Sequence, residues 1–181
     1  MERDDAHLLQ GFRREDPDTF TPIVQAYQGQ MLAFALRILG NLPDAEDAVQ
    51  DAFLRAYRWL SSAPPARWRS LRLRPWLYRI TLNECRRLLG RRRPAVTLDG
   101  IGPLTHDPDP RDVLLLRKVV DALHTLGLRH RSALLLRVVH GLSYEETADA
   151  LGVPVGTAKS LVHRALVRLQ RSLGEAREEA L

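Results

Sequence analysis

Along most of this chain, apolar side chains recur at intervals of three and four residues, the period of a helix that buries one face. The first such stripe lies between Thr19 and Leu39 and predicts a helix there. Gly29 lies within the stripe and predicts a break in this helix, since glycine weakens helices. Gly40 and Asn41 follow, and both residue types tolerate the backbone conformation that ends a helix.

Two further helices are predicted in the first half of the chain. One begins near Pro43 and Asp44, and its apolar residues continue in an unbroken series to Leu60. The next begins at Pro75, because proline suits the first turn of a helix, where its missing N–H is not needed. We expect this helix to end near Leu89.

The C-terminal part of the chain predicts four helical segments, at 112–126, 129–139, 143–151 and 155–173. Ser143, followed three residues later by Glu146, predicts a capping box at the start of the third segment. Gly152 then permits a sharp turn into the last one. This spacing is typical of a helix-turn-helix, with Ala158, Val162, Ala165 and Leu169 as the buried stripe of the second helix.

No segment shows sustained strand alternation, so the predicted fold class is all-α. Residues 94–112 contain four prolines and two glycines without helical periodicity, which indicates a linker. We therefore expect two small helical domains, 8–93 and 113–175, joined by a flexible acidic Pro/Gly-rich linker over 94–112. The helix-turn-helix belongs to the second domain.

Composition narrows the class of protein. The 181 residues include one cysteine, Cys85, which excludes an internal disulfide framework and any cysteine-based zinc site. No apolar run approaches the roughly 20 residues of a membrane span, and the acidic N-terminus differs from a signal peptide. We expect a soluble cytoplasmic protein, with Cys85 as a small buried residue.

The net charge of +5 is unevenly distributed. Residues 1–51 carry −6, residues 52–93 carry +11, residues 94–112 carry −3 and residues 113–181 carry +3. An acidic block beside a strongly basic one indicates two surfaces for two partners, one of them a polyanion. The alternative is that each charge run is only a solvated face.

Three sets of polar residues are the candidate binding sites. On the last helix, donors suited to phosphates and base edges point away from the buried stripe: Thr157, Lys159, Ser160, His163 and Arg164. On the helix from Pro75, four polar residues share one face: Arg79, Asn83, Arg86 and Arg87. On the helix before it, an acidic set suits a basic protein partner: Asp44, Glu46, Asp47, Gln50 and Asp51.

Each set has a simpler explanation. Asp44 and Asp47 favour a helix N-terminus through its dipole alone. The aromatic residues near the arginines can stack on unpaired bases, but Trp76, beside Leu77 and Ile80, is expected to be core. A helical hairpin with a solvated polar face also accounts for the last two helices.

Catalytic motifs are missing. The six histidines are scattered, and no phosphate-binding glycine loop, nucleophile elbow or dinucleotide fingerprint occurs. We therefore expect no enzyme activity, no cofactor and no metal site.

Three stretches in order resemble one family: DAEDAVQDAFLRAYRWL (44–60), RPWLYRITLNECRRLLGRRR (74–93) and GLSYEETADALGVPVGTAKSLVHRALVRLQ (141–170). They resemble bacterial RNA polymerase sigma factors of the sigma-70 family, and the short two-domain form is similar to the extracytoplasmic-function group. The resemblance covers roughly residues 8–175.

The resemblance implies a role for each candidate set. The acidic set matches residues that dock on the clamp coiled coil of the largest subunit of core RNA polymerase, whose flap is a second contact. The arginine set matches residues that bind the minus-ten promoter element, with a loop near 61–74 that captures an unstacked base. The set on the last helix matches residues that read the minus-thirty-five element, and an anti-sigma protein is a further implied partner.

The chain departs from the family pattern at three single positions and in one loop, Ala63 to Leu73, which is unusually rich in Pro and Arg. Leu161 stands where many relatives have Arg, Arg87 where relatives often have Asp, and Arg129 where Pro is common. Two other functions stay open at this point: a helix-turn-helix regulator that acts without core polymerase, and an RNA-binding or structural adaptor that uses the arginine face alone.

Overall fold

The computed structural model describes residues 2–68, 70–91 and 120–178, and these residues divide between two compact units, Met1–Leu98 and Asp99–Leu181. Helices make up most of the described residues and no strand occurs among them, which confirms the all-α class. The predicted linker over 94–112 lies outside the described residues.

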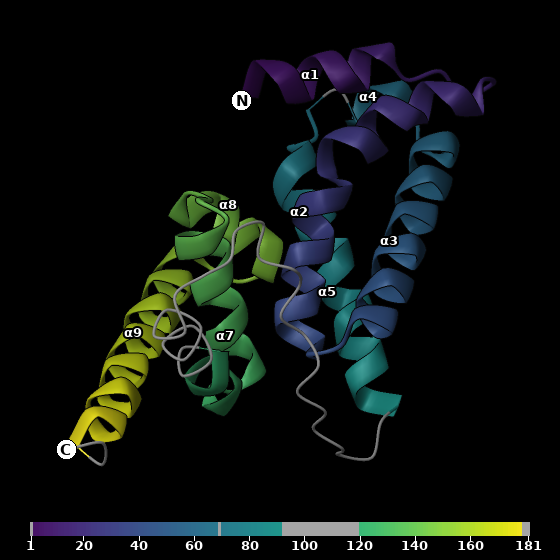
Figure 1. Cartoon of the computed structure of the whole chain (residues 1–181). Coiled ribbons are helices and arrows are strands. Elements are labelled where there is room, and N and C mark those ends of the chain that lie inside the picture. The colour runs from purple at the N-terminus through teal and green to yellow at the C-terminus, as the bar shows by residue number, and fades with distance from the viewer. Residues whose placement is uncertain (1, 69, 92–119, 179–181) are drawn as a thin grey trace. The chain divides into compact units, whose positions relative to one another are not determined.

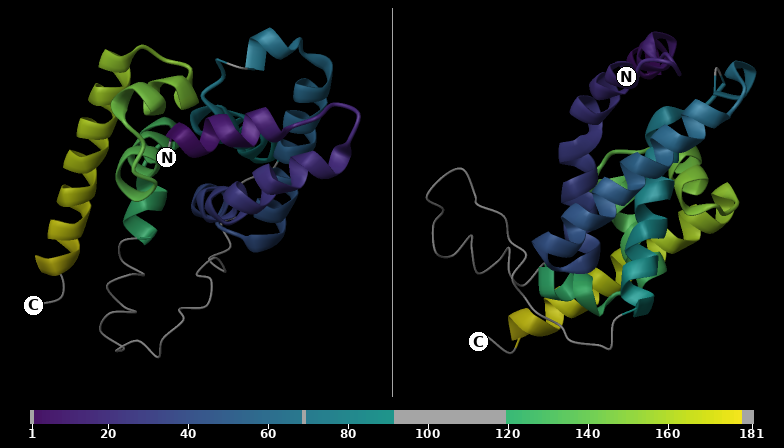
Figure 2. Two further views of the ribbon diagram at one scale, coloured as in Figure 1. Left: turned by 90° about the horizontal axis from the view of Figure 1, so that it is seen from above. Right: turned by 90° about the vertical axis from the view of Figure 1, so that its right-hand side faces the viewer.

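The first unit is built on a three-helix bundle (Figure 1; Figure 2). Its elements are α1 (Glu2–Gly11), the 3₁₀ turn η1 (Pro17–Phe20), α2 (Thr21–Leu39), α3 (Leu42–Ser62), α4 (Pro65–Trp68) and α5 (Leu73–Arg91). Helices α2, α3 and α5 pack against one another, and α1 lies across one end of them in contact with α5. The bundle brings the acidic α3 beside the arginine-rich α5.

The boundaries of α2 and α3 follow from local chemistry. Gly40 ends α2 with a positive φ of 77°, as its position after the apolar stripe predicted. Asn41 then caps α3, since its Oδ1 accepts a hydrogen bond from the Asp44 N–H at 3.0 Å. The predicted break at Gly29 is wrong: α2 is continuous there, because Gly29 lies exposed and its neighbours hold the helix against the bundle.

Buried aromatic and aliphatic residues form the core of this bundle. Phe34 of α2 meets Tyr78 of α5 edge to face, with ring centroids 5.3 Å apart. Burial raises the pKa of Tyr78 to about 12. Cys85 is buried as expected, and its burial raises the pKa of the thiol to about 12, so the thiol is a core group rather than a reactive one.

Helix α1 has no counterpart among the predicted elements. It is held by Phe12, which follows it and is 1% exposed, in edge contact with Phe20, Tyr57 and Trp68. Asp5 adds a polar anchor, since it accepts hydrogen bonds from the Tyr27 hydroxyl and from a backbone N–H of α5. Tertiary contacts of this kind stabilise a short helix that its own sequence barely favours.

The second unit contains a helical stretch at 120–125, α7 (Leu128–Leu134), the π-helical segment η2 (Leu135–Val139), α8 (Tyr144–Leu151) and α9 (Val155–Glu178). The helical segment predicted at 129–139 corresponds to α7 and η2, and its last turn widens to π geometry. The His140 N–H accordingly bonds to the Leu135 carbonyl oxygen, five residues back, at 2.9 Å.

The helix-turn-helix forms as its spacing predicted. Ser143 and Glu146 make both hydrogen bonds of the capping box, at 3.1 Å and 2.7 Å. Gly152 ends α8 with a φ of 68° and opens the turn into α9. The stripe on α9 is buried at Ala158, Val162 and Ala165, so the opposite face of α9 is left to solvent.

Candidate functional site

The acidic set forms a surface on the first half of α3. We call it the acidic surface; it consists of Asp44, Glu46, Asp47, Gln50 and Asp51. Glu46, Asp47 and Gln50 are exposed, whereas Asp44 and Asp51 are partly buried. Asp44 lies in the first turn beside the Asn41 cap, where a negative charge stabilises the helix dipole. The exposed members are the ones available to a basic partner.

Asp51 joins the acidic surface to α5 through an ion-pair network. Arg87 of α5 pairs with Asp51 and also, through Nε, with Glu84 Oε2 at 2.7 Å. Glu84 Oε1 in turn pairs with Arg55 Nε of α3 at 2.5 Å. The hydrogen bond to Glu84 raises the pKa of the Arg87 guanidinium. Two carboxylates therefore hold Arg87 at the seam between α3 and α5.

The other residues of the predicted minus-ten set lie on α5 with more open surroundings. Arg79 and Asn83 are exposed, and Arg86 is half-buried. Arg86 donates a hydrogen bond from Nη1 to Asn83 Oδ1 at 3.0 Å. The set is therefore divided: Arg86 bonds to Asn83 along α5 and Arg79 is exposed, while Arg87 pairs with Asp51 of α3.

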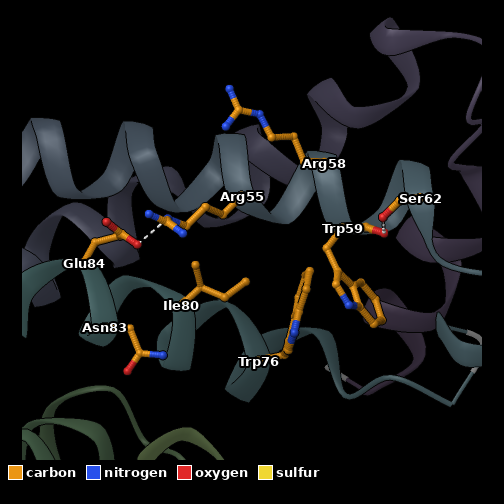
Figure 3. Close-up of a pocket in the computed structure, with 8 residues that line it drawn as sticks. All are labelled: Arg55, Arg58, Trp59, Ser62, Trp76, Ile80, Asn83 and Glu84. Carbon is orange, nitrogen blue, oxygen red and sulfur yellow. Dashed lines mark hydrogen bonds and ion pairs between the residues drawn. The ribbon is translucent and has the colours of Figure 1, made fainter. Parts of the chain in front are cut away.

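A groove of about 490 Å³ runs between α3 and α5 (Figure 3). We call it the tryptophan groove; it is lined by Arg55, Arg58, Trp59, Ser62, Trp76, Ile80, Asn83 and Glu84. The Trp59 and Trp76 rings are 5.0 Å apart between centroids and inclined by 52°. Figure 3 shows these indoles toward one end of the groove and the Arg55–Glu84 ion pair toward the other.

The groove corrects one expectation and adds residues to the site. Trp76, expected in the core, is half-buried and lines the groove instead. Arg55, Arg58 and Glu84 were not among the predicted site residues. The signal for Glu84 was present, because it is the one carboxylate among twelve arginines in residues 52–93. The groove itself had no sequence signal, since its two walls come from separate helices.

All five predicted residues of α9 are exposed on one helix: Thr157, Lys159, Ser160, His163 and Arg164. Ser160 donates its hydroxyl hydrogen bond to the Gly156 carbonyl oxygen at 2.9 Å. A shallow hollow of about 220 Å³ is lined by Gly156, Thr157, Ser160, Leu161 and Arg164. Leu161 is 9% exposed. At position 161, where many relatives of the family carry Arg, this chain therefore has a largely buried leucine.

Tyr144, the first residue of α8, links α9 to the segment before it. Two cations lie over its ring, Arg137 at 5.0 Å and Lys159 at 5.6 Å from the ring centroid. Arg137 also donates a hydrogen bond to the Leu142 carbonyl oxygen at 3.3 Å. Sequence reasoning did not select Tyr144 or Arg137, because only the fold brings them to Lys159.

Other kinds of site find no support in the parts of the chain that the structure describes. Within 2–68, 70–91 and 120–178, no three His, Cys, Asp or Glu side chains gather closely enough to hold a metal ion. Among the same residues, no helix combines the length and the apolar character that crossing a bilayer requires.

Comparison with known families matches both units. Residues 23–94 match the model of sigma-70 region 2, and residues 116–169 match that of sigma-70 region 4. The acidic surface and the tryptophan groove therefore fall within the region 2 match. The helix-turn-helix falls within the region 4 match.

Individual proteins agree with this result. The chain is 31% identical to the RNA polymerase sigma-H factor of Pseudomonas aeruginosa, over 97% of each protein. It is 34% identical to the ECF RNA polymerase sigma-E factor of Escherichia coli K12, over 89% of this chain and 90% of that one. A solved structure of the sigma factor RpoE with the anti-sigma factor NepR, from Bartonella quintana, has a TM-score of 0.68 at 28% identity, covering 86% of this chain and 96% of that one.

Sigma factors of this family start transcription without an enzymatic activity of their own. The chain belongs to the sigma-70 family of RNA polymerase sigma factors, in its extracytoplasmic-function group, and directs the initiation of transcription.

Proposed function

We propose that this sigma factor divides its binding among three surfaces. The acidic surface binds core RNA polymerase, the tryptophan groove with α5 binds and opens the minus-ten element, and α9 reads the minus-thirty-five element as duplex. The tryptophan groove is the observation that carries this proposal, because a helix-turn-helix regulator that binds only duplex has no use for it.

The chemistry of the groove suits unpaired bases. Aromatic rings stack on any base, and Trp59 and Trp76 present two indoles toward one end of it. Arg55 and Arg58 supply positive charge for the backbone on the α3 wall, and Asn83 supplies an amide on the α5 wall. A base that leaves the duplex stack can therefore be held by stacking and by its edges.

Helix α9 suits a duplex. Its exposed Lys159 and Arg164 can neutralise phosphates, while Thr157, Ser160 and His163 offer hydrogen bonds to base edges. The turn at Gly152 and the buried stripe hold α9 against α8 in the arrangement that enters a major groove.

The acidic surface suits a basic protein partner and not nucleic acid. By resemblance to the family, that partner is the clamp coiled coil of the largest polymerase subunit, with the flap as a second contact. Arg87 ties Asp51 to the fold, so we assign the direct contact to the exposed Glu46, Asp47 and Gln50.

An anti-sigma protein is a further proposed partner. The RpoE of Bartonella quintana, which this chain resembles in fold, was solved bound to the anti-sigma factor NepR. A protein of that kind binding here would compete with polymerase or promoter for the same surfaces.

Transcription in vitro with purified core polymerase tests the proposal. We expect the protein to co-elute with core and to direct run-off transcripts from a small number of sites on genomic DNA. A protein that binds a duplex alone but neither co-elutes with core nor starts any transcript is a simple regulator, and the proposal then fails.

The groove has its own test within this experiment. We expect Trp76→Ala to weaken holoenzyme binding to a single-stranded minus-ten oligonucleotide by roughly 1–3 kcal/mol, the usual contribution of one stacked base. Gln25→Ala is the control, because Gln25 is exposed on α2 and does not line the groove. Equal losses in the two variants would remove the groove from promoter binding.

A further inference from the structure

Glu84 stands apart from the residues around it. It is the one carboxylate in a stretch that carries twelve arginines, and it is 3% exposed in the middle of α5. A buried carboxylate is costly unless it is paired and hydrogen-bonded, so its partners are an integral part of the bundle.

Each oxygen of Glu84 receives one guanidinium. Oε1 pairs with Arg55 Nε from α3 at 2.5 Å, and Oε2 pairs with Arg87 Nε from α5 at 2.7 Å. Arg87 continues to Asp51 through Nη2. The resulting chain, Arg55–Glu84–Arg87–Asp51, crosses from the tryptophan groove to the acidic surface.

The two arginines, Arg55 and Arg87, differ in how much of the side chain is exposed to solvent. The side chain of Arg55 is 57% exposed and lines the groove, so one edge of its guanidinium is held while the rest faces solvent. The side chain of Arg87 is 29% exposed and is held by two carboxylates. Glu84 thus fixes where Arg55 stands and cancels part of the positive charge of both arginines.

We propose that Glu84 is a positioning residue for the minus-ten strand: it holds Arg55 on the wall of the tryptophan groove and restrains Arg87 at the α3–α5 seam. Its effect is to favour the matched sequence over other single strands. A fixed guanidinium sets the register in which the bases of the strand reach the groove, whereas a free one attracts any phosphate. This inference rests on the proposed function of the groove.

The test uses holoenzyme made from the full chain and core polymerase. The probes are two labelled single-stranded oligonucleotides: the non-template minus-ten sequence of a promoter mapped by run-off transcription, and a scrambled sequence of equal composition. Affinity for both is measured over a series of salt concentrations.

In Glu84→Gln the side chain keeps its size and loses its charge. We expect tighter binding of the scrambled strand and a salt slope that steepens by about 0.7, the contribution of one released arginine on a single strand. Only Arg55 is released, because Arg87 stays paired with Asp51. The preference for the matched strand should fall by roughly fivefold, the effect of misplacing one hydrogen bond.

Glu84→Asp provides a second variant that keeps the charge and moves it by one methylene. Here the matched preference should fall while the salt slope stays unchanged. Glu15→Gln is the matched control, because it removes the same charge from an exposed position outside the three surfaces. Its preference for the matched strand and its salt slope should both equal those of the wild type.

A role for Glu84 in stability alone predicts a different pattern. Both oligonucleotides would then lose affinity in proportion, with no change in slope or preference, and the inference would be overturned. If the wild-type holoenzyme already shows no preference for the matched strand, the proposed function of the groove fails as well. If the wild type prefers it and Glu84→Gln keeps that preference, only the role of Glu84 fails.

Discussion

Arg131 is a buried cation whose partner is an imidazole. It is 8% exposed on α7, and its Nη1 lies 2.7 Å from Nδ1 of His124. Because an arginine can only donate, Nδ1 must accept, which requires a neutral imidazole. Burial lowers the pKa of His124, and the charge of Arg131 lowers it further. Burial also lowers the pKa of Arg131 itself.

This pair predicts that the second unit loses stability in mild acid. The folded pKa of His124 lies below its ordinary value of 6.5, so the unfolded chain binds more protons as the pH falls below that value. Stability is therefore full above about pH 6.5 and declines with further acidification. Urea unfolding of the full chain, followed by circular dichroism at about pH 7.5 and about pH 5.5, should show a lower midpoint at the acidic pH.

Two controls belong to this measurement. His124→Gln should reduce the difference between the two pH values, whereas substitution of the exposed His163 should leave it unchanged. All three tryptophans, Trp59, Trp68 and Trp76, lie in the first unit, so tryptophan fluorescence reports that unit separately. An acid shift seen equally by fluorescence and dichroism would contradict the assignment to His124.

At the scale of the element, α2 shows how packing overrides local preference. Gly29 favours a break, yet α2 runs unbroken from Thr21 to Leu39 because Tyr27, Met31 and Phe34 are buried on its other side. A Cβ added at Gly29 meets no atom within 4 Å, and its φ is not in the left-handed region.

Gly29→Ala should therefore stabilise the first unit by roughly 0.5–1 kcal/mol, through helix propensity and a less flexible unfolded chain. Gly141→Ala is the opposite case, because Gly141 has a φ of +66° that alanine tolerates poorly. The urea midpoint by tryptophan fluorescence should rise in Gly29→Ala, and that by circular dichroism should fall in Gly141→Ala. A fall in Gly29→Ala would mean that α2 needs the glycine.

Helix α9 predicts a salt-dependent contact with duplex DNA. Replacing Lys159 or Arg164 by Ala should lower the slope of log affinity against log salt by about 0.9 each if each touches a phosphate. Arg171→Ala is the control, since Arg171 is exposed further along the same helix. An unchanged slope in both variants would show that these residues are only solvated.

At the scale of the whole molecule, the charge is separated by surface. The net +5 combines an acidic surface on α3, a groove walled by arginines between α3 and α5, and an exposed polar face on α9. The carboxylates of α3 and the arginines of α5 attract one another, and every ion pair between them removes a charge that a partner could bind. The Asp51–Arg87 ion pair joins the acidic surface to α5 at the seam, and Glu46 and Asp47 stay exposed.

This separation predicts that the surfaces can be impaired independently. Asp47→Arg in the full chain should weaken core polymerase binding at least about tenfold, because like charges facing each other across an interface cost several kcal/mol. Its affinity for a minus-thirty-five duplex should stay at the wild-type value. Co-elution with core and duplex titration measure the two effects, and an equal loss of both would contradict the division of labour.

Much of the local structure was predictable because it depends on neighbours in sequence. The stop at Gly40, the capping box of Ser143 and Glu146, and the turn at Gly152 each involve residues within a few positions of one another. The docking of α1 was not predictable, because it depends on residues far along the chain, such as the backbone N–H of Arg74 that bonds to Asp5.

By itself, the sequence determined the all-α class, the family and the separation of acidic from basic residues along the chain. These three conclusions follow from hydrophobic periodicity, motif order and charge, which are properties of the sequence alone. The tertiary structure decided which of the charged residues act together. Glu84 forms ion pairs with Arg55 and Arg87, and Trp76 lines a groove, because α3 and α5 lie side by side. The physical reason is that ion pairs and stacking act over a few ångströms, a distance that spacing along the chain specifies only within one helix.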